Sequence, residues 1–378
     1  MRRLRICAIE PSGRLYGSER SLLELLERLD RSRFDPDVVI PPGAPLAARL
    51  AASGIPSAGI LRFGAPGDRR LRRLLSLLRL VLHLVYRRCD LVYLNQGRLL
   101  RPIARVASLL RLPVVCQCTT LYDVVRVGEN PRSHRPVRAF VCVSDFIADR
   151  GSLPPERLSV IYRAYVPKGL RRPRRSVSSP DSFTVGLIGR ICEQKGHGIV
   201  VRAARLLRER HPGVFRVRFV GEADDGVYLD SLRRLIRETG VTAMIEFRGF
   251  RRDIAPELAE LDALVIASRE EALGRVFLEA AEAGVPAVVA DEGGPAELAR
   301  RFSLGRRFPR DSPGELARAL VEMRDDYDAE RRRCEESAAR MMLSLAPEPY
   351  LGAYEELFLK AAKRQDVAIR WTGVDTPA

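Results

Sequence analysis

The sequence predicts an α/β protein made of two doubly wound, Rossmann-like domains that face each other across a cleft. The chief observation is that short apolar, β-branched runs alternate with helical patterns along both halves of the chain. Each half also begins with such a run, followed by a loop that contains glycine. In addition, 378 residues exceed the size at which one hydrophobic core usually suffices. Strands separated by helices indicate parallel sheets with helices on both faces.

The predicted strands are the apolar runs themselves. In the first half they are LRICAIEP (4–11), DVVI (37–40), DLVYLN (90–95), PVVCQC (113–118), AFVCVS (139–144) and LSVIY (158–162). In the second half they are FTVGLIGR (183–190), FRVRFVG (215–221), IEFRGF (245–250), ALVIAS (263–268) and PAVVA (286–290). The stretch DPD, from Asp35 to Asp37, precedes a predicted strand and is expected to form a turn.

The domain boundaries follow from composition. Residues 1–170 should form the first domain and residues 183–345 the second. Residues 171–182 are rich in Arg, Pro and Ser and lack periodicity, so they are expected to be a linker. Residues 346–364 should form a helix that returns to the first domain. Residues 365–378 carry no clear pattern and are expected to be a disordered tail.

The charge is distributed unevenly. Residues 1–180 contain 33 Arg and Lys against 14 Asp and Glu, or +19, and the remainder contains 31 against 34, or −3. The basic half favours a negatively charged partner or surface. A nucleic-acid partner is not expected, because no aromatic residues are interleaved with the basic ones and no nucleic-acid-binding motif is recognisable. Most of the 64 basic residues are arginine, and only four are lysine, so a lysine within a motif stands out.

The sequence predicts no metal site, no disulfide framework and no membrane span. Seven scattered cysteines without a CxxC pair indicate reduced thiols in a cytosolic protein. The histidines, including His83 in an apolar helix, are expected to be incidental. The chain has no uncharged apolar run of spanning length and no signal-peptide pattern at its start. The leucine-rich stretch 71–86, flanked by arginines, either covers the sheet or lies on an anionic membrane surface, which would make the protein peripheral at the inner face of the membrane.

One candidate loop, GRICEQKGHG, follows the first strand of the second half. Open parallel sheets bind ligands at the carboxyl ends of their strands. Glycine at 189 lets the backbone approach a phosphate, and Arg190 and Lys195 can donate charge-assisted hydrogen bonds to a diphosphate. The helix that should begin near Gly198 points free N–H groups at an anion. The alternative is a surface turn with two solvated cations.

A second candidate stretch, SREEALGRVFLEAAEAGVP, runs from Ser268 to Pro286. It begins where a predicted strand ends, which places Glu271 at the mouth of the cleft and Glu279 in a helix that begins near Gly274. A carboxylate is a good bidentate partner for the vicinal hydroxyls of a ribose or a sugar. The alternative makes Glu271 a partner of the helix dipole and Glu279 part of a solvated face.

Together these residues resemble the retaining glycosyltransferases of family 4, which have the GT-B fold. The resemblance rests on the E-x7-E pattern from Glu271 to Glu279 and on the loop GRICEQKG, and it extends over residues 1 to about 360. It implies that Arg190 and Lys195 hold the donor diphosphate, that Glu279 holds the ribose, and that Glu271 holds the transferred sugar. The further donor-side residues that it implies are Gly17, Gly189, Ser268, Gly274, Arg275 and Val276, and we expect Asn95, Thr119 and Ser144 on the acceptor side.

The resemblance implies a cytoplasmic, metal-independent, hexosyltransferase-like enzyme that needs no cofactor beyond its nucleotide-diphosphate sugar. Its acceptor would be a glycan or a lipid-linked glycan in the synthesis of cell-surface polysaccharide. Three places depart from the family pattern: Tyr16-Gly17 replaces Gly-Gly, Thr119 replaces a histidine, and Arg163-Ala164 replaces Asn-Gly. Two alternatives therefore stay open, a catalytically silent nucleotide-sugar-binding partner of another transferase and a nucleotide-sugar epimerase of the same fold.

Overall fold

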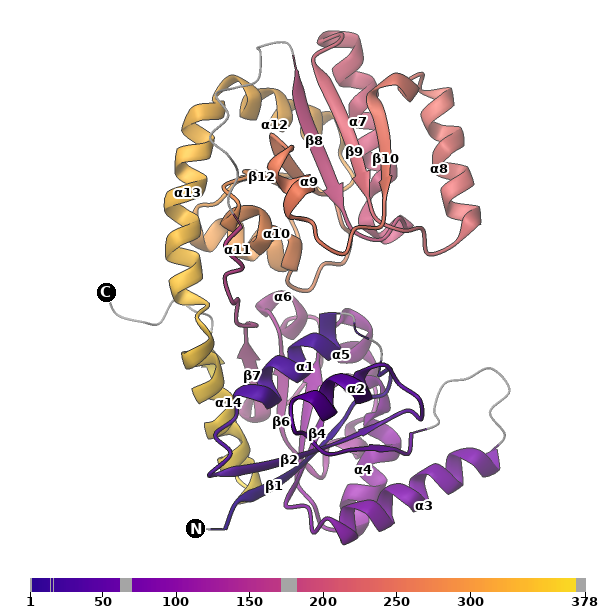
Figure 1. Cartoon of the computed structure of the whole chain (residues 1–378), viewed down its shortest axis with the longest axis vertical. Coiled ribbons are helices and arrows are strands. Elements are labelled where there is room, and N and C mark those ends of the chain that lie inside the picture. The colour runs from indigo at the N-terminus through magenta and orange to yellow at the C-terminus, as the bar shows by residue number, and fades with distance from the viewer. Residues whose placement is uncertain (1, 14, 16, 62–69, 171–181, 372–378) are drawn as a thin grey trace. The chain divides into compact units, whose positions relative to one another are not determined.

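The computed structural model describes residues 2–13, 15, 17–61, 70–170 and 182–371. The chain divides into two compact units, which are described separately (Figure 1). The first unit comprises Met1–Ala164 and Leu345–Ala378, and the second comprises Tyr165–Ser344. Helix α14 (Pro347–Ala362) thus belongs to the first unit. The predicted linker lies outside the described residues except for its last residue, Ser182.

The first unit is built on a parallel sheet of eight strands in the order β14-β7-β6-β5-β4-β1-β2-β3. The strands are β1 (Leu4–Ile9), β2 (Phe34–Ile40), β3 (Ser57–Gly59), β4 (Leu91–Leu94), β5 (Val114–Cys118), β6 (Val137–Cys142), β7 (Leu158–Ile161) and β14 (Arg370–Trp371). Every strand predicted for this half is present. The additional strands β3 and β14 are too short to show a hydrophobic period.

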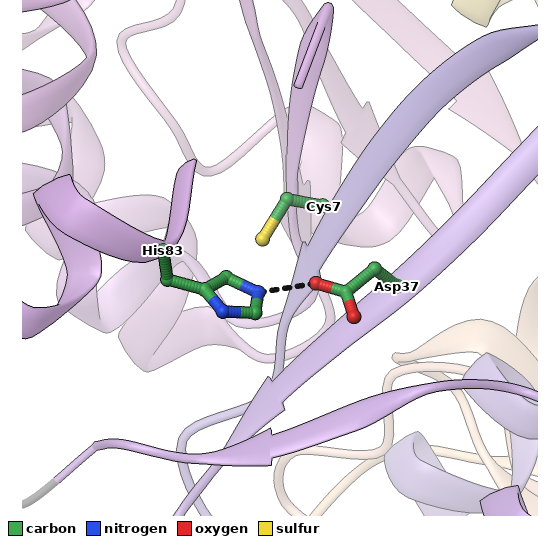
Figure 2. Close-up of side chains that lie close together, drawn as sticks. All are labelled: Cys7, Asp37 and His83. Carbon is green, nitrogen blue, oxygen red and sulfur yellow. Dashed lines mark hydrogen bonds and ion pairs between the residues drawn. The ribbon is translucent and has the colours of Figure 1, made fainter. Parts of the chain in front are cut away.

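Helices cover both faces of this sheet. Besides α14 they are α1 (Gly17–Arg28), α2 (Leu46–Ala52), α3 (Arg70–Tyr86), α4 (Leu100–Leu109), α5 (Leu121–Gly128) and α6 (Asp145–Ala148), with 3-10 turns at Gly97–Leu99, Pro131–His134 and Pro155–Arg157. Leucines of α1 and aromatic residues of α14 pack on one face, against Ile6, Ala8 and Val38. Because side chains alternate along a strand, Cys7 and Asp37 face the other side, where α3 lies (Figure 2).

The second unit is built on a parallel sheet of six strands in the order β10-β9-β8-β11-β12-β13. The strands are β8 (Phe183–Ile188), β9 (Phe215–Val220), β10 (Ile245–Gly249), β11 (Ala263–Ile266), β12 (Ala287–Ala290) and β13 (Arg306–Phe308). The helices are α7 (His197–Arg210), α8 (Gly226–Glu238), α9 (Ala255–Ala259), α10 (Arg275–Glu282), α11 (Gly294–Phe302), α12 (Pro313–Asp325) and α13 (Tyr327–Ser344), with 3-10 turns at Glu193–Lys195 and Thr242–Met244. Both halves therefore have the predicted parallel α/β architecture.

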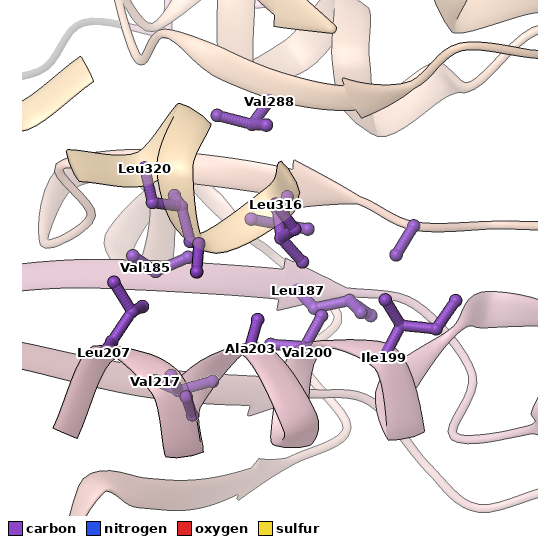
Figure 3. Close-up of a cluster of buried hydrophobic side chains, with 14 of the residues drawn as sticks. Val185, Leu187, Ile199, Val200, Ala203, Leu207, Val217, Val288, Leu316 and Leu320 are labelled. Carbon is purple, nitrogen blue, oxygen red and sulfur yellow. The ribbon is translucent and has the colours of Figure 1, made fainter. Parts of the chain in front are cut away.

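The core of the second unit lies between β8 and the helices α7 and α12. Val185 and Leu187 of β8 are buried in one cluster with Leu207 of α7 and Leu316 of α12 (Figure 3). A fully buried aliphatic side chain contributes about 1.5–3 kcal/mol to folding. This layer holds the carboxyl end of β8, and the loop that follows it, in a fixed position.

Two expectations from the sequence are corrected. Asp35 and Asp37 lie within β2 and not in a turn, because this strand pairs with β1 from Phe34 onward and includes Pro36. Residues 365–371 of the predicted disordered tail are described and make defined contacts, and residues 372–378 lie outside the described residues. Asp366 forms ion pairs of 2.9 Å with Arg138 and with Arg157, and the chain then adds β14 beside β7. These contacts join residues that are far apart in the sequence, so no local sequence pattern predicts them.

None of the described helices combines the length and the apolar character needed to cross a bilayer.

The glycine that precedes α7 offers a test of how closely the loops after β8 and β11 pack. Gly196 has φ of +75°, and a Cβ placed on it would lie 2.1 Å from the carbonyl oxygen of Ala267. Gly213 has a similar φ of +82° with nothing within 4 Å. Gly213→Ala should cost about 1–2 kcal/mol of left-handed backbone strain, and Gly196→Ala about 3 kcal/mol or more, since the clash adds to that strain. Urea unfolding measures both, and equal losses would contradict the packing described.

Candidate functional site

The carboxyl ends of β8 and β11 carry the two loops that the sequence analysis identified. The two strands are neighbours in the sheet, with Ala263 beside Val185 and Leu264 beside Gly186. A hydrogen bond of 2.9 Å from the N–H of Arg269 to the carbonyl of Gln194 joins the loops directly. Residues 189–196 and 267–274 therefore form one continuous edge of the second unit.

The first feature of this edge is an ion pair between Lys195 and Glu271. The two side chains are 25% and 21% exposed, so a ligand in solution can reach both. The hydroxyl of Ser268 donates to the same carboxylate over 3.5 Å. A methyl group on Gly189 would lie 3.5 Å from Cε of Lys195, so the lysine side chain passes closely over this glycine. The structure thus brings Gly189, Lys195, Ser268 and Glu271 together.

The second feature is an ion pair between Lys168 and Glu279 on α10. The Glu279 side chain is only 9% exposed. The segment that carries Lys168 is docked on the same helix through Glu282, which accepts 2.7 Å hydrogen bonds from the N–H groups of Lys168 and Gly169 and a 2.5 Å bond from the hydroxyl of Tyr165. Each of the two predicted site carboxylates therefore has a lysine partner, in a chain with four lysines.

Sequence reasoning missed Lys168. It lies in the stretch assigned to the end of the first domain, without a motif around it. The available signal was compositional, since a lysine in an arginine-rich chain is unusual. Its contact with Glu279 depends on how the segment before the predicted linker folds back onto α10, which local sequence does not determine.

Two helices begin at this edge with their N-termini. Gly196 and Gly274 have φ of +75° and +80° and lead into α7 and α10. The N–H groups in the first turn of a helix have no partner within that helix and favour an anion. The N–H of Gly294, at the start of α11, donates to the carbonyl of Glu271 at 2.8 Å and holds this loop in place. A lysine and two helix N-termini thus provide a setting for a phosphate group.

Three further predicted donor-side residues belong to the second unit. Arg190 pairs with Asp224 at 2.6 Å and is 63% exposed, so the structure directs it away from the Lys195–Glu271 pair. Arg275 and Val276 open α10, and the next residue, Phe277, is fully buried and anchors the helix.

The acceptor-side residues follow neighbouring strands of the first unit. Asn95, Thr119 and Ser144 come after β4, β5 and β6, which are adjacent in the sheet. The hydroxyl of Thr119 donates to Asp123 at 3.0 Å. Ser144 is fully buried and caps α6 by accepting from the N–H of Ile147, so its hydroxyl has a structural task.

A buried carboxylate at the same edge, Glu10, was not singled out in the sequence. It accepts hydrogen bonds from the side-chain amides of Asn95 and Gln96, at 2.5 and 2.9 Å, and from the N–H of Ser12 at 2.7 Å. Burial raises the pKa of Glu10, and these hydrogen bonds oppose that shift. Its sequence signal was its position directly after the first strand, where side chains reach the ligand-binding edge of a parallel sheet.

Two of the positions that depart from the family pattern also meet in the first unit. The guanidinium of Arg163 donates to the carbonyl of Gly17 over 3.2 Å, at the start of α1. Tyr16 lies outside the described residues.

Comparison with known proteins identifies the class. A family model described as "Glycosyl transferases group 1" matches residues 171–341, and one described as "Glycosyltransferase Family 4" matches residues 16–167. Together they match most of the chain. Among solved structures, Anabaena Alr3699/HepE in complex with UDP aligns with a TM-score of 0.77 and 20% identity, over 94% of this chain and all of that one. A glycosyltransferase from Rickettsia africae aligns with a TM-score of 0.79 and 15% identity, over 97% of this chain and 100% of that one.

Curated relatives agree with this class. The D-inositol 3-phosphate glycosyltransferase of Paenarthrobacter aurescens is 31% identical over 51% of this chain, and the alignment spans 48% of that relative. The lipopolysaccharide core biosynthesis glycosyltransferase LpsE of Rhizobium meliloti is 28% identical over 62% of this chain, and the alignment spans 69% of the relative. The chain belongs to glycosyltransferase family 4 and has the GT-B fold, as its sequence predicted.

A buried histidine beside the Lys195 loop gives a pH test. His197 is fully buried, and its ring meets Phe219 edge-on with centroids 4.9 Å apart. Burial lowers the pKa of His197 to about 4, whereas the unfolded chain has a value of about 6.5. The unfolded state therefore binds more protons between these values, so the stabilisation is complete above about pH 6.5 and is lost as the pH falls toward 4.

We expect this histidine to reduce the free energy of unfolding by about 3 kcal/mol between pH 6.5 and 4. His197→Gln should flatten that part of the pH profile. Phe219→Leu disturbs the same ring contact but keeps the histidine, so it should lower stability while the slope persists. Urea unfolding across this range measures the slope, and a steep slope retained in His197→Gln would refute the assignment.

Proposed function

We propose that this protein transfers a sugar, with retention of configuration, from a nucleotide-diphosphate sugar to a glycan or lipid-linked glycan in the synthesis of cell-surface polysaccharide. The observation that carries the proposal is the arrangement of the second unit's edge, where Glu271 and Glu279 each pair with a lysine beside two helix N-termini. Similar proteins support the substrate class, since they include a lipopolysaccharide core glycosyltransferase and HepE in complex with UDP-glucose.

The donor diphosphate would bind at Lys195. An ammonium group has three donors, so Lys195 can keep its bond to Glu271 while it also donates to a phosphate oxygen. Departure of the nucleoside diphosphate builds negative charge, which the lysine and the N-termini of α7 and α10 stabilise. Arg190 would supply a second cation, because its pair with Asp224 is exposed and such pairs contribute at most about 1 kcal/mol.

The two carboxylates would then hold the two sugars on either side of the diphosphate. Glu279, the more buried of the pair, would accept from the ribose hydroxyls, and Lys168 would have to share or release it. Glu271 is more exposed and adjoins Ser268, which suits the transferred sugar at the solvent side. The acceptor hydroxyl would attack from the face that the diphosphate leaves, through an oxocarbenium-like state.

The first unit would hold the acceptor. Its polar edge at Asn95 and Thr119 lies at the carboxyl ends of adjacent strands, and the first 180 residues carry the excess positive charge that suits an anionic glycan. One observation also favours a second function. Thr119 replaces the family histidine and its hydroxyl is engaged by Asp123, as expected of a silent partner that binds donor without transferring the sugar. Donor binding without turnover in the presence of candidate acceptors would favour that reading.

A ligand screen tests the donor site. We expect one nucleotide sugar from a panel that includes UDP-glucose and GDP-mannose to stabilise the protein, by about 2.7 kcal/mol at 100 times its dissociation constant. Lys195→Ala should weaken the nucleoside diphosphate about 10- to 100-fold, because a charge-assisted hydrogen bond contributes about 1.5–3 kcal/mol. Arg205→Ala, on the exposed side of the same helix region, is the control and should leave the affinity unchanged. Unchanged affinity in Lys195→Ala would remove Lys195 from the site.

Helix α3 would attach the first unit to an anionic membrane surface. Its exposed apolar residues include Leu74, Leu78 and Leu82, which are 64%, 54% and 61% exposed, and also Leu71, Leu75, Val85 and Tyr86. At about 100° per residue these positions share one face about 120° wide, opposite the buried Leu80 and Leu84. Exposed arginines border this stripe at Arg72 and Arg79. Apolar residues flanked by cations suit a helix that lies in the interface of anionic lipid.

Flotation with vesicles tests the membrane attachment. The protein should float with vesicles that contain phosphatidylserine at low salt and be released as salt rises. Arg72→Gln and Arg79→Gln together should weaken binding roughly 30-fold, at about 1 kcal/mol per cation. Leu343→Gln, at an exposed leucine of the second unit, is the control. Protein that ignores anionic lipid, or that dimerises through this face, would contradict the proposal.

A further inference from the structure

The face of the first sheet that α3 covers contains a cluster of side chains that can bind a metal, two of them buried and one, His83, partly exposed. Cys7 on β1 and Asp37 on β2 are register partners, so their side chains point to the same face. His83 reaches them from α3 (Figure 2). The thiol sulfur, a carboxylate oxygen and a ring nitrogen all lie within 4.8 Å of one another.

This cluster is unusual for the interior of a sheet. Cys7 is fully buried and Asp37 is 4% exposed. A carboxylate at such a position destabilises the fold unless opposite charge or hydrogen bonds compensate for its lost hydration. Nε2 of His83 contacts one oxygen of Asp37, and Nε of Arg87 lies 3.7 Å from the other. One oxygen of the carboxylate thus faces the histidine and the thiol, while the other faces a cation.

A second thiol adjoins the cluster. Cys89 is buried just before β4, the other neighbour of β1, and its nearness raises the pKa of the Cys7 thiol. One sulfur, one imidazole nitrogen and one carboxylate oxygen therefore lie close together between α3 and strands β1 and β2, and a second sulfur lies beside them.

We propose that Cys7, Asp37 and His83, with Cys89 as the fourth ligand, bind a transition-metal ion of the zinc class. Sulfur, nitrogen and carboxylate oxygen are the ligands of tetrahedral zinc, whereas Mg²⁺ and Ca²⁺ take mainly oxygen. Zinc bonds of about 2.0–2.3 Å place ligand atoms about 3.3–3.8 Å apart, so small side-chain rotations would close this cluster around an ion. Arg87 would orient the ligating carboxylate through its other oxygen.

The ion would have a structural task in the first unit. Its ligands come from α3 and from the sheet beneath it, so binding would fasten α3, whose outward face is apolar, to β1 and β2. Binding requires that the thiols lose their protons, which are released to solvent. The proposal does not depend on the donor site, whose residues belong to the second unit.

Cobalt and zinc titrations of the full, metal-free chain test the site. One equivalent of Co²⁺ should produce the near-ultraviolet absorption of a thiolate–cobalt bond and the visible bands of a tetrahedral ion, and Zn²⁺ should abolish both. Zinc at 100 times its dissociation constant should also raise the Tm by about 5–10 °C. Absence of thiolate absorption in the wild-type chain would by itself overturn the proposal.

Cys7→Ser is the decisive variant, because it keeps the His83–Asp37 contact and nearly the same volume. It should lose about half of the thiolate absorption, the part that belongs to the Cys7 sulfur, and weaken Co²⁺ binding at least tenfold. Cys334→Ser, at a buried cysteine of the second unit, should bind as the wild type does. If Cys7→Ser binds Co²⁺ as tightly as the wild type, with the same spectrum, these residues do not form the site. Should this variant fold poorly, the wild-type spectrum still decides between the two outcomes.

Discussion

The proposed donor site depends on one electrostatic arrangement, in which two carboxylates at the edge of the second unit are each neutralised by a lysine. Glu279 is nearly buried and Glu271 is partly so, and an uncompensated charge at either position would be costly. Lys168 and Lys195 remove that cost while no ligand is bound. The same ammonium groups can turn to a phosphate or share a carboxylate with a hydroxyl. The parallel sheet matters because it brings the loops after β8 and β11 to one edge.

Much of this arrangement was predictable from the sequence. The alternation of apolar runs and helical patterns predicted the strands of both sheets. This was possible because a buried parallel strand appears in the sequence as a short apolar run. The two glutamates and Lys195 stood out because they follow predicted strands. What local patterns could not supply were contacts between distant segments. Lys168 reaches Glu279 from 111 positions away, and β14 joins β7 through only two residues.

In the first unit, too, local sequence patterns did not predict a contact between distant segments. From the sequence, Asp37 was predicted to lie in a turn and His83 was predicted to have no functional role. Strand register and helix packing nevertheless bring both residues together beside Cys7. The helix that carries His83 presents leucines to solvent on its opposite face. A single helix therefore combines a buried polar anchor with an exposed apolar surface. This combination is the basis for the proposal that α3 stays attached to its sheet while it contacts a membrane.

The division of labour between the two carboxylates is the central claim, and calorimetry with matched ligands tests it most directly. The affinities of the nucleoside diphosphate and of the intact nucleotide sugar are measured for Glu279→Gln and Glu271→Gln. The account predicts that Glu279→Gln weakens both ligands, because the ribose is common to both. Glu271→Gln should leave the nucleoside diphosphate unchanged and reduce binding or turnover of the nucleotide sugar alone. Equal losses of nucleoside diphosphate affinity in the two variants would contradict it.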